Sequence, residues 1–130
     1  MILFVDEGMG RYIVPEAIRQ AGHVAHAHLD HFPQGTPDVA WIEDVTKRGW
    51  VIVGKDKGHR FEPLEMLAIQ RAGARLFTLA SGKRSGPENA EAIVKALKAM
   101  ERFDAAHAPP YIARITRSGT VEAIYAPNSR

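Results

Sequence analysis

The chain has 130 residues and a mass of 14.3 kDa, with 45% hydrophobic and 25% charged residues. This size and composition are typical of a single globular domain and exclude wholesale disorder, a coiled coil and a collagen-like repeat. The absence of cysteine excludes a disulfide framework, a thiolate zinc site and a cysteine nucleophile. The first apolar run, residues 1–5, is too short for a signal peptide or a membrane span, so we expect a soluble, cytoplasmic protein.

The net charge of +2 conceals a difference between the two halves of the chain. Residues 1–65 contain 7 Lys and Arg against 10 Asp and Glu, whereas residues 66–130 contain 10 against 5. This distribution gives weak support to a carboxylate site beside a surface that attracts polyanions.

Strands and helices are predicted to alternate along the first half of the chain. Residues 2–5 form a short apolar run typical of a buried parallel strand. Apolar spacing predicts a helix over 11–21, with Gly22 placed to cap it, and a strand over 23–28. Thr36, Pro37 and Asp38 have the order N-cap, first helical position and first-turn acid, so a second helix is expected from there to Gly49.

The same alternation continues through the second half. Residues 50–53 and 75–79 are apolar strands, and Pro63 opens a helix between them that ends at Gly73. Pro87 begins the longest helix, which ends before Pro109-Pro110. Residues 111–116 and 120–125 are typical of a β-hairpin appended to the main body.

This order of elements predicts a three-layer α/β/α fold with a mainly parallel central sheet and a C-terminal β-hairpin. We assign residues 1–105 to the α/β unit. Residues 106–130 form a C-terminal extension that belongs to the same single domain.

Acidic side chains are expected at one edge of this sheet. Asp6 and Glu7 follow the first strand, Asp56 follows the third, and Asp38 begins a helix on the same side. Ligands of open α/β sheets bind beyond the carboxyl ends of the strands. Carboxylates gathered there repel one another unless a cation or a proton compensates them, and oxygen ligands suit Mg²⁺ or Mn²⁺. The alternative is that Asp38 only opposes a helix dipole and Asp56 only occupies a turn.

The segments that carry these acids resemble PIN-domain ribonucleases, in particular the VapC-like toxins. They are residues 2–7, 21–23, 36–38 with the following helix, and 51–57, in the order that the family has them. The resemblance covers about residues 1–105 and implies a PIN-like fold. It also implies a Mg²⁺-dependent endoribonuclease, with Asp6, Asp38 and Asp56 as catalytic, metal-binding acids.

One position departs from the family pattern. Many relatives carry a further Asp two positions after the acid that matches Asp56, where this chain has Gly58. Glu7, Glu43 and Asp44 are the candidate replacements, and Glu7 is our choice as a further metal ligand. Gly58 also keeps open the alternative of a catalytically inactive PIN-like module that only binds a partner or nucleic acid.

In the expected reaction, one or two Mg²⁺ ions lower the pKa of a water molecule that hydrolyses an RNA phosphodiester bond. The resemblance implies an RNA substrate and a cognate antitoxin as partners, with a homodimer as an open alternative, and the lack of a long apolar stretch predicts no contact with a membrane. Trp41 and Trp50 are interpreted as core residues rather than base-stacking platforms. Basic side chains in the flanking loops are candidate phosphate ligands, namely Lys55, Lys57, His59, Arg60, Lys83 and Arg84.

Two rival functions use other residues or give Asp56 another role. His26, His28 and His31 form a series that is compatible with zinc or nickel, although no fourth ligand is evident. A phosphorelay receiver would use Asp56 as phosphoacceptor and Thr78 as its switch residue, but the expected Lys-Pro pair is absent.

Overall fold

The computed structural model describes residues 1–56, 61–80 and 85–130, and its centre is a mixed sheet with the strand order β2-β1-β3-β4-β6-β7. The first five strands in this order are mutually parallel, and β7 is antiparallel to β6. Two short strands, β5 and β8, pair with each other outside this sheet. The strands are β1 (Ile2–Val5), β2 (Val24–Ala27), β3 (Val51–Lys55), β4 (Arg75–Leu79), β5 (His107–Ala108), β6 (Tyr111–Ile115), β7 (Val121–Tyr125) and β8 (Asn128–Ser129).

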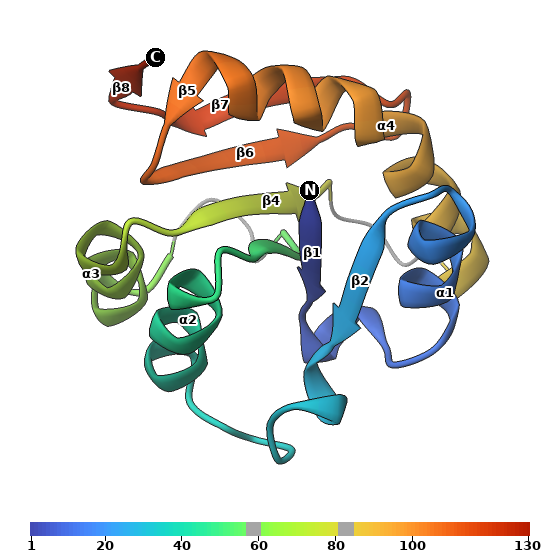
Figure 1. Cartoon of the computed structure of the whole chain (residues 1–130), viewed down its shortest axis with the longest axis horizontal. Coiled ribbons are helices and arrows are strands. Elements are labelled where there is room, and N and C mark those ends of the chain that lie inside the picture. The colour runs from blue at the N-terminus through green and yellow to red at the C-terminus, as the bar shows by residue number, and fades with distance from the viewer. Residues whose placement is uncertain (57–60, 81–84) are drawn as a thin grey trace.

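Four α-helices cover the two faces of the sheet, as Figure 1 shows. Helices α1 (Ile13–Gln20) and α4 (Gly86–Ala106) lie on one face, and α2 (Asp38–Lys47) and α3 (Pro63–Ala72) lie on the other. Two short 3-10 helices, η1 (Glu7–Met9) and η2 (His28–Asp30), follow β1 and β2. The predicted three-layer α/β/α architecture is therefore confirmed. No helix in the described ranges is both long and apolar enough to cross a membrane.

Alternation along the strands divides the core into two layers. Leu3 and Val5 of β1 pack with α1 and α4, whereas Phe4 between them packs with α2 and α3. Phe4 belongs to a row of buried residues in register on four neighbouring strands, Phe4, Ile52, Leu76 and Ile112. Trp41 and Trp50 are buried in the same layer, so their interpretation as core residues is confirmed.

The helix ends agree with the sequence signals, with one exception. Gly73 ends α3 with φ 70°, and Ser85 and Glu88 form a capping box at the start of α4. The prediction that Thr36 is the N-cap of α2 was wrong. Pro37 holds that position, and the Thr36 hydroxyl donates a hydrogen bond back to the carbonyl oxygen of Pro33 (2.7 Å).

The predicted hairpin over 111–125 is present, but it is not an appendage. Its first strand, β6, pairs in parallel with β4 from Arg75↔Tyr111 to Leu79↔Ile115, and so extends the central sheet. Tyr111, Ile112 and Ile115 are fully buried as a result. The sequence pattern of a hairpin does not show which other strand its first strand will join.

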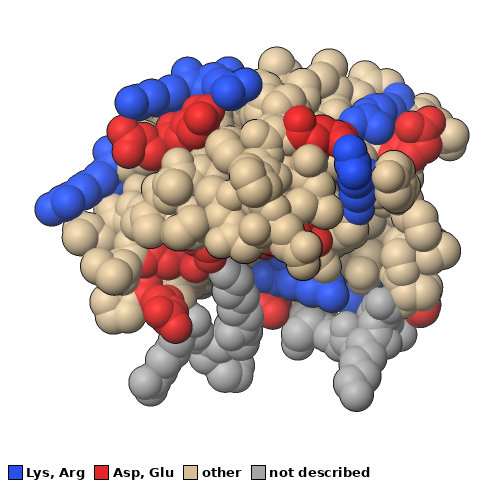
Figure 2. All heavy atoms as spheres, turned by 90° about the horizontal axis from the view of Figure 1, so that it is seen from below, with Lys and Arg blue, Asp and Glu red and all other residues tan. Residues whose placement is uncertain are grey.

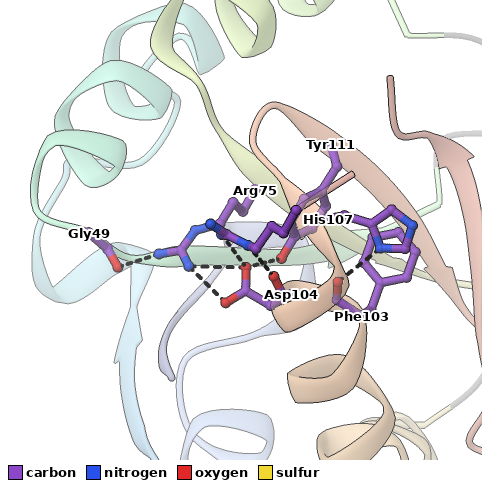
Figure 3. A network of polar contacts seen from close by, with 7 residues as sticks. Gly49, Arg75, Phe103, Asp104, His107 and Tyr111 are labelled. Carbon is purple, nitrogen blue, oxygen red and sulfur yellow. Dashed lines mark hydrogen bonds and ion pairs between the residues drawn. The ribbon is translucent and has the colours of Figure 1, made fainter. Parts of the chain in front are cut away.

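A polar network fastens the amino ends of β4 and β6 to the end of α4 (Figure 3). The Asp104 carboxylate accepts hydrogen bonds from Arg75 Nη1 (3.1 and 3.2 Å) and from the Tyr111 hydroxyl (2.9 Å), and it forms an ion pair with Arg130 (3.7 Å). Arg75 also donates to the carbonyl oxygen of Gly49, just before β3 (2.9 Å). This network lies at the end of the sheet opposite to the predicted acidic edge.

Candidate active site

The carboxyl ends of β3, β4 and β6 present a second row of residues in register. Gly54, Thr78 and Arg114 are paired across these strands, each two positions beyond the buried row of the α2/α3 layer. Because side chains two positions apart share a face of the sheet, this second row also lies on the α2/α3 side. The candidate site is therefore the outer continuation of that core layer.

Asp6 joins this row from the end of β1. Its backbone N–H donates to the carbonyl oxygen of Val53 (2.9 Å), and its Oδ1 accepts a hydrogen bond from the Glu7 N–H (2.7 Å). A Cβ atom placed on Gly54 would lie 3.4 Å from Asp6 Oδ2, so the carboxylate packs directly against the Gly54 backbone. These contacts fix the orientation of the Asp6 side chain.

Three acidic residues are among those that line one narrow hollow at this edge. Asp6 contributes from the end of β1, Asp38 from the first residue of α2, and Glu65 from the first turn of α3. Trp41 Nε1 donates to Asp38 Oδ1 (3.1 Å), which orients that carboxylate from the core side. Thr78 and Lys55, one of the predicted phosphate ligands, form part of the same lining. The structure thus brings together two of the predicted acids and adds Glu65.

Glu65 is the acid that the sequence reasoning missed. It lies in the first turn of the helix that follows β3, just as Asp38 lies at the start of the helix that follows β2. The rule that selected Asp38, namely that such a helix begins at the carboxyl edge of the sheet, therefore also selects Glu65. Its place inside the run Pro63 to Ala72 made it indistinguishable from an ordinary first-turn acid.

Asp56 follows β3 as predicted, but the structure places its carboxylate against a cation. Arg114 Nε donates to Asp56 Oδ2 (3.1 Å), and the Asp56 side chain is only 11% exposed. The Asp56 N–H donates to the carbonyl oxygen of Leu79 (3.0 Å), which ties the residue to the end of β4. Asp56 is absent from the lining of the hollow formed by Asp6, Asp38 and Glu65.

Glu7 faces a different group of residues. Its Oε2 lies 3.8 Å from Nε2 of the buried His28 and 3.5 Å from the Gly35 N–H. The His28 ring packs among Phe4, Phe32 and Trp41. Glu7 thus joins η1 to the loop before α2. Glu43 and Asp44 pair with Lys47 and Arg48 on the surface of α2.

The histidine series divides between two environments. His26 Nδ1 and His31 Nε2 are 3.1 Å apart, and the His26 ring stacks on Trp50 at 3.9 Å. His28 is turned into the core, so the three rings do not converge on one point. Partial burial, followed by the proximity of His31, lowers the pKa of His26 below its ordinary value.

Acidic and basic side chains are interspersed over the surface seen in Figure 2 rather than separated into two patches. Lys55 is exposed at the end of β3. The other basic loop residues proposed as phosphate ligands lie outside the described residues, namely Lys57, His59, Arg60, Lys83 and Arg84. Gly58 also lies outside them.

The donor set of the hollow fits a hard divalent cation. Asp6, Asp38 and Glu65 offer carboxylate oxygens in a hollow that Lys55 also lines, and Mg²⁺ is commonly bound by one or two carboxylates together with several retained waters. Within the ranges that the structure describes, no group of three His, Asp or Glu side chains converges closely enough to enclose an ion. A cation held at this edge of the sheet would therefore keep part of its water shell.

Comparison with known proteins agrees with this architecture. Residues 1–81 match the family described as "PIN like domain". Over 104 residues the chain is 28% identical to a protein of Mycobacterium tuberculosis (strain ATCC 25618 / H37Rv) named "Putative ribonuclease VapC45", with 77% of this chain and 75% of that protein covered. No solved structure gives a significant match. The family match spans more than half of the chain, so the protein belongs to the PIN-like domain family and the predicted resemblance is confirmed.

Proposed function

We propose that this protein is a Mg²⁺-dependent endoribonuclease, with Mn²⁺ as a substitute ion. The observation that carries the proposal is the hollow lined by Asp6, Asp38 and Glu65 at the carboxyl edge of a PIN-like sheet. The name of the Mycobacterium tuberculosis relative supports RNA as the substrate. Asp6, Asp38 and Glu65 would hold the ion, and Asp56 would join them when it leaves Arg114. We assign the role of further metal ligand to Glu65 instead of Glu7, because the Glu7 carboxylate faces His28.

The bound ion would supply an activated water and neutralise charge that develops on the phosphate. Backbone and side-chain groups of the protein hold the metal-binding acids in place. The Glu7 N–H and the Gly54 backbone hold Asp6, and Trp41 Nε1 holds Asp38. Glu65 comes from a different helix and is the candidate general base that accepts a proton from the attacking water. No covalent intermediate with the protein is needed.

Cleavage of labelled RNA by wild type and by Asp6→Asn tests this function. Single-stranded and structured RNAs are incubated with Mg²⁺, Mn²⁺ or EDTA, and Glu43→Gln serves as a control that removes a surface carboxylate outside the hollow. We expect metal-dependent cleavage by wild type and Glu43→Gln but not by Asp6→Asn. Absence of cleavage by wild type, together with absence of Mg²⁺ and Mn²⁺ binding in calorimetry, would contradict the proposal.

The Asp56–Arg114 ion pair favours a second candidate, an inactive PIN-like module that binds RNA or a protein without cleavage. A module that binds no metal could keep the Arg114 guanidinium group paired with Asp56, one of the expected metal ligands. The same assay separates the two functions. RNA retention by wild type in a filter-binding assay, without metal-dependent cleavage, would select the module.

We further propose that the protein acts in the cytoplasm as the toxin of a toxin-antitoxin pair, on the strength of the relative's VapC name. Induction of the wild-type gene should arrest growth, and Asp6→Asn should abolish the arrest. Co-expression of the cognate antitoxin should restore growth. Light scattering on the purified chain would decide between the monomer mass of 14.3 kDa and a homodimer.

A further inference from the structure

Arg114 stands in the same row as the residues of the candidate site, although it comes from the C-terminal part of the chain. Its register partner on β4 is Thr78, and the register partner of Thr78 on β3 is Gly54, over which Asp6 lies. Adjacent strands are about 4.8 Å apart, so the Arg114 backbone lies about 10 Å from that of Gly54. An RNA strand that crosses this edge of the sheet would meet the acids first and Arg114 next.

The guanidinium group of Arg114 still has hydrogen-bond donors available while it contacts Asp56. Its Nε donates to Asp56 Oδ2 (3.1 Å), whereas its two Nη groups have no hydrogen-bond partner among the described residues. The side chain is 32% exposed, so it is accessible from solvent while it contacts Asp56. Arginine binds phosphate through two parallel N–H donors, and the Nη groups leave this mode of binding available.

From this geometry we propose that Arg114 is an RNA-phosphate ligand that rests on the Asp56 carboxylate and exchanges it for a phosphate oxygen when RNA binds. The inference rests on the proposed nuclease function and deepens it. The exchange would remove the Arg114 cation from Asp56, which favours attraction of the divalent ion to that carboxylate, at the same time as it anchors the substrate. RNA and the metal ion would thus favour each other's binding, because both separate the same ion pair.

A purely structural role of Arg114 predicts a different effect of its removal on metal and RNA binding. If Arg114 served only to neutralise a nearly buried Asp56, its removal would disturb Asp56, and both metal and RNA would bind less well. If the exchange occurs, removal of Arg114 takes a competing cation from Asp56, and metal binding improves while RNA binding weakens. The two affinities move in opposite directions only in the second case.

The experiment compares wild type, Arg114→Met, Arg114→Lys and Arg102→Met. Arg102 is an exposed residue near the C-terminal end of α4, at the opposite end of the sheet, and it controls for the loss of one positive charge. Binding of a fluorescein-labelled single-stranded RNA is measured in EDTA over a range of salt concentrations. Binding of Mn²⁺ alone is measured by calorimetry, and circular dichroism verifies the fold of each variant.

We expect Arg114→Met to bind RNA about fivefold more weakly, with a salt slope reduced by about 0.7, as for the loss of one phosphate contact to a single strand. Its Mn²⁺ affinity should rise severalfold. Arg102→Met should match wild type in both measurements. Arg114→Lys should keep the wild-type salt slope with weaker RNA binding, and it decides the RNA arm if Arg114→Met does not fold.

An Arg114→Met protein with the RNA affinity and salt slope of wild type, or with weakened binding of both RNA and Mn²⁺, would overturn the inference. Neither result depends on catalysis. If wild type cleaves RNA and Arg114→Met behaves in one of these ways, the nuclease function stands and only the inference fails. If wild type cleaves nothing but the RNA slope still falls by the expected amount, the contact with phosphate is supported and the nuclease function fails.

Discussion

The Asp6 carboxylate lies against the backbone of Gly54, on the neighbouring strand, where a side chain larger than a methyl group would compete for its place. A Cβ atom on Gly54 would lie 3.4 Å from Asp6 Oδ2 and 3.5 Å from Asp6 Cβ. These are contact distances, so a single methyl group fits and a branched side chain does not. The glycine therefore determines where the first acid of the candidate site can point.

Substitution at Gly54 should consequently change metal binding before it changes the fold. Gly54→Ala should bind Mn²⁺ like wild type, whereas Gly54→Val should push Asp6 aside and reduce the affinity about tenfold, the usual effect of disturbing a group that orients a metal ligand. Valine is well suited to a buried parallel strand, so circular dichroism should remain that of wild type. Calorimetry with Mn²⁺ provides the measurement. Equal affinities for the alanine and valine variants would show that Asp6 does not depend on this contact.

Glu65→Gln should weaken Mn²⁺ binding at least about tenfold, because it replaces one charged oxygen donor of the hollow with a neutral amide. Glu16→Gln, on the exposed surface of α1, is the matched control and should bind like wild type. Calorimetric titrations of the two variants in the same buffer give the comparison. If Glu65→Gln retains wild-type affinity, Glu65 lines the hollow without holding the ion.

The Asp104 network should contribute to stability without affecting the site. Asp104→Asn removes the charge that Arg75 and the Tyr111 hydroxyl share, and we expect a loss of about 2 kcal/mol in the free energy of unfolding. Tyr111→Phe should cost about 1 kcal/mol, because only one hydrogen bond is lost. Urea denaturation at pH 7 measures both. Glu43→Gln, which breaks an exposed pair with Lys47, should cost less than about 0.5 kcal/mol.

His26 should make the protein less stable in mildly acidic solution. Partial burial and then His31 lower the pKa of His26, with further lowering from Arg19 and Arg48 and an opposing effect from Asp30. The unfolded chain therefore takes up a proton near pH 6.5 while the folded chain still resists it, so the free energy of unfolding falls as the pH decreases from about 7 to 5.

His26→Gln should reduce this loss of stability between pH 7.5 and pH 5.5, as should His31→Gln, which removes the neighbouring imidazole. Urea denaturation of the three proteins at the two pH values gives the difference directly. A variant that loses as much stability on acidification as wild type would show that the His26–His31 contact does not control the acid response.

Much of the fold could be predicted from the sequence because its local signals agree with one another. Apolar runs at 2–5, 50–53 and 75–79 marked the parallel strands, and Pro63 and Gly73 marked the ends of α3. The order of the strands could be predicted less well. Nothing in residues 111–115 indicates that they pair with β4, because register depends on contacts between segments far apart in sequence.

The candidate site was predicted only in part, because local signals identify some of its residues and long-range contacts determine the others. Asp6 and Asp38 follow from a rule about the ends of strands and the starts of helices, and the structure places them in one hollow. Glu65 obeys the same rule, but its position resembles that of any first-turn acid. The contact between Asp56 and Arg114 spans 58 positions and depends on the pairing of β6 with β4, which the sequence pattern did not disclose.

Because the core is divided into two layers, the two faces of this small sheet tolerate different amino-acid substitutions. The row Phe4, Ile52, Leu76 and Ile112 leads, one pleat later, to the candidate site, whereas Leu3, Val5 and Phe77 face α1 and α4 and lead to none of its residues. Substitutions in the apolar part of the α1/α4 layer need only preserve packing. In the α2/α3 layer, Trp41, Ile42, Ile52 and Leu76 also line the hollow of the candidate site, so a change of volume there alters the surroundings of the acids. A designer who wished to install a different chemistry on this scaffold would keep the first layer and rebuild the second.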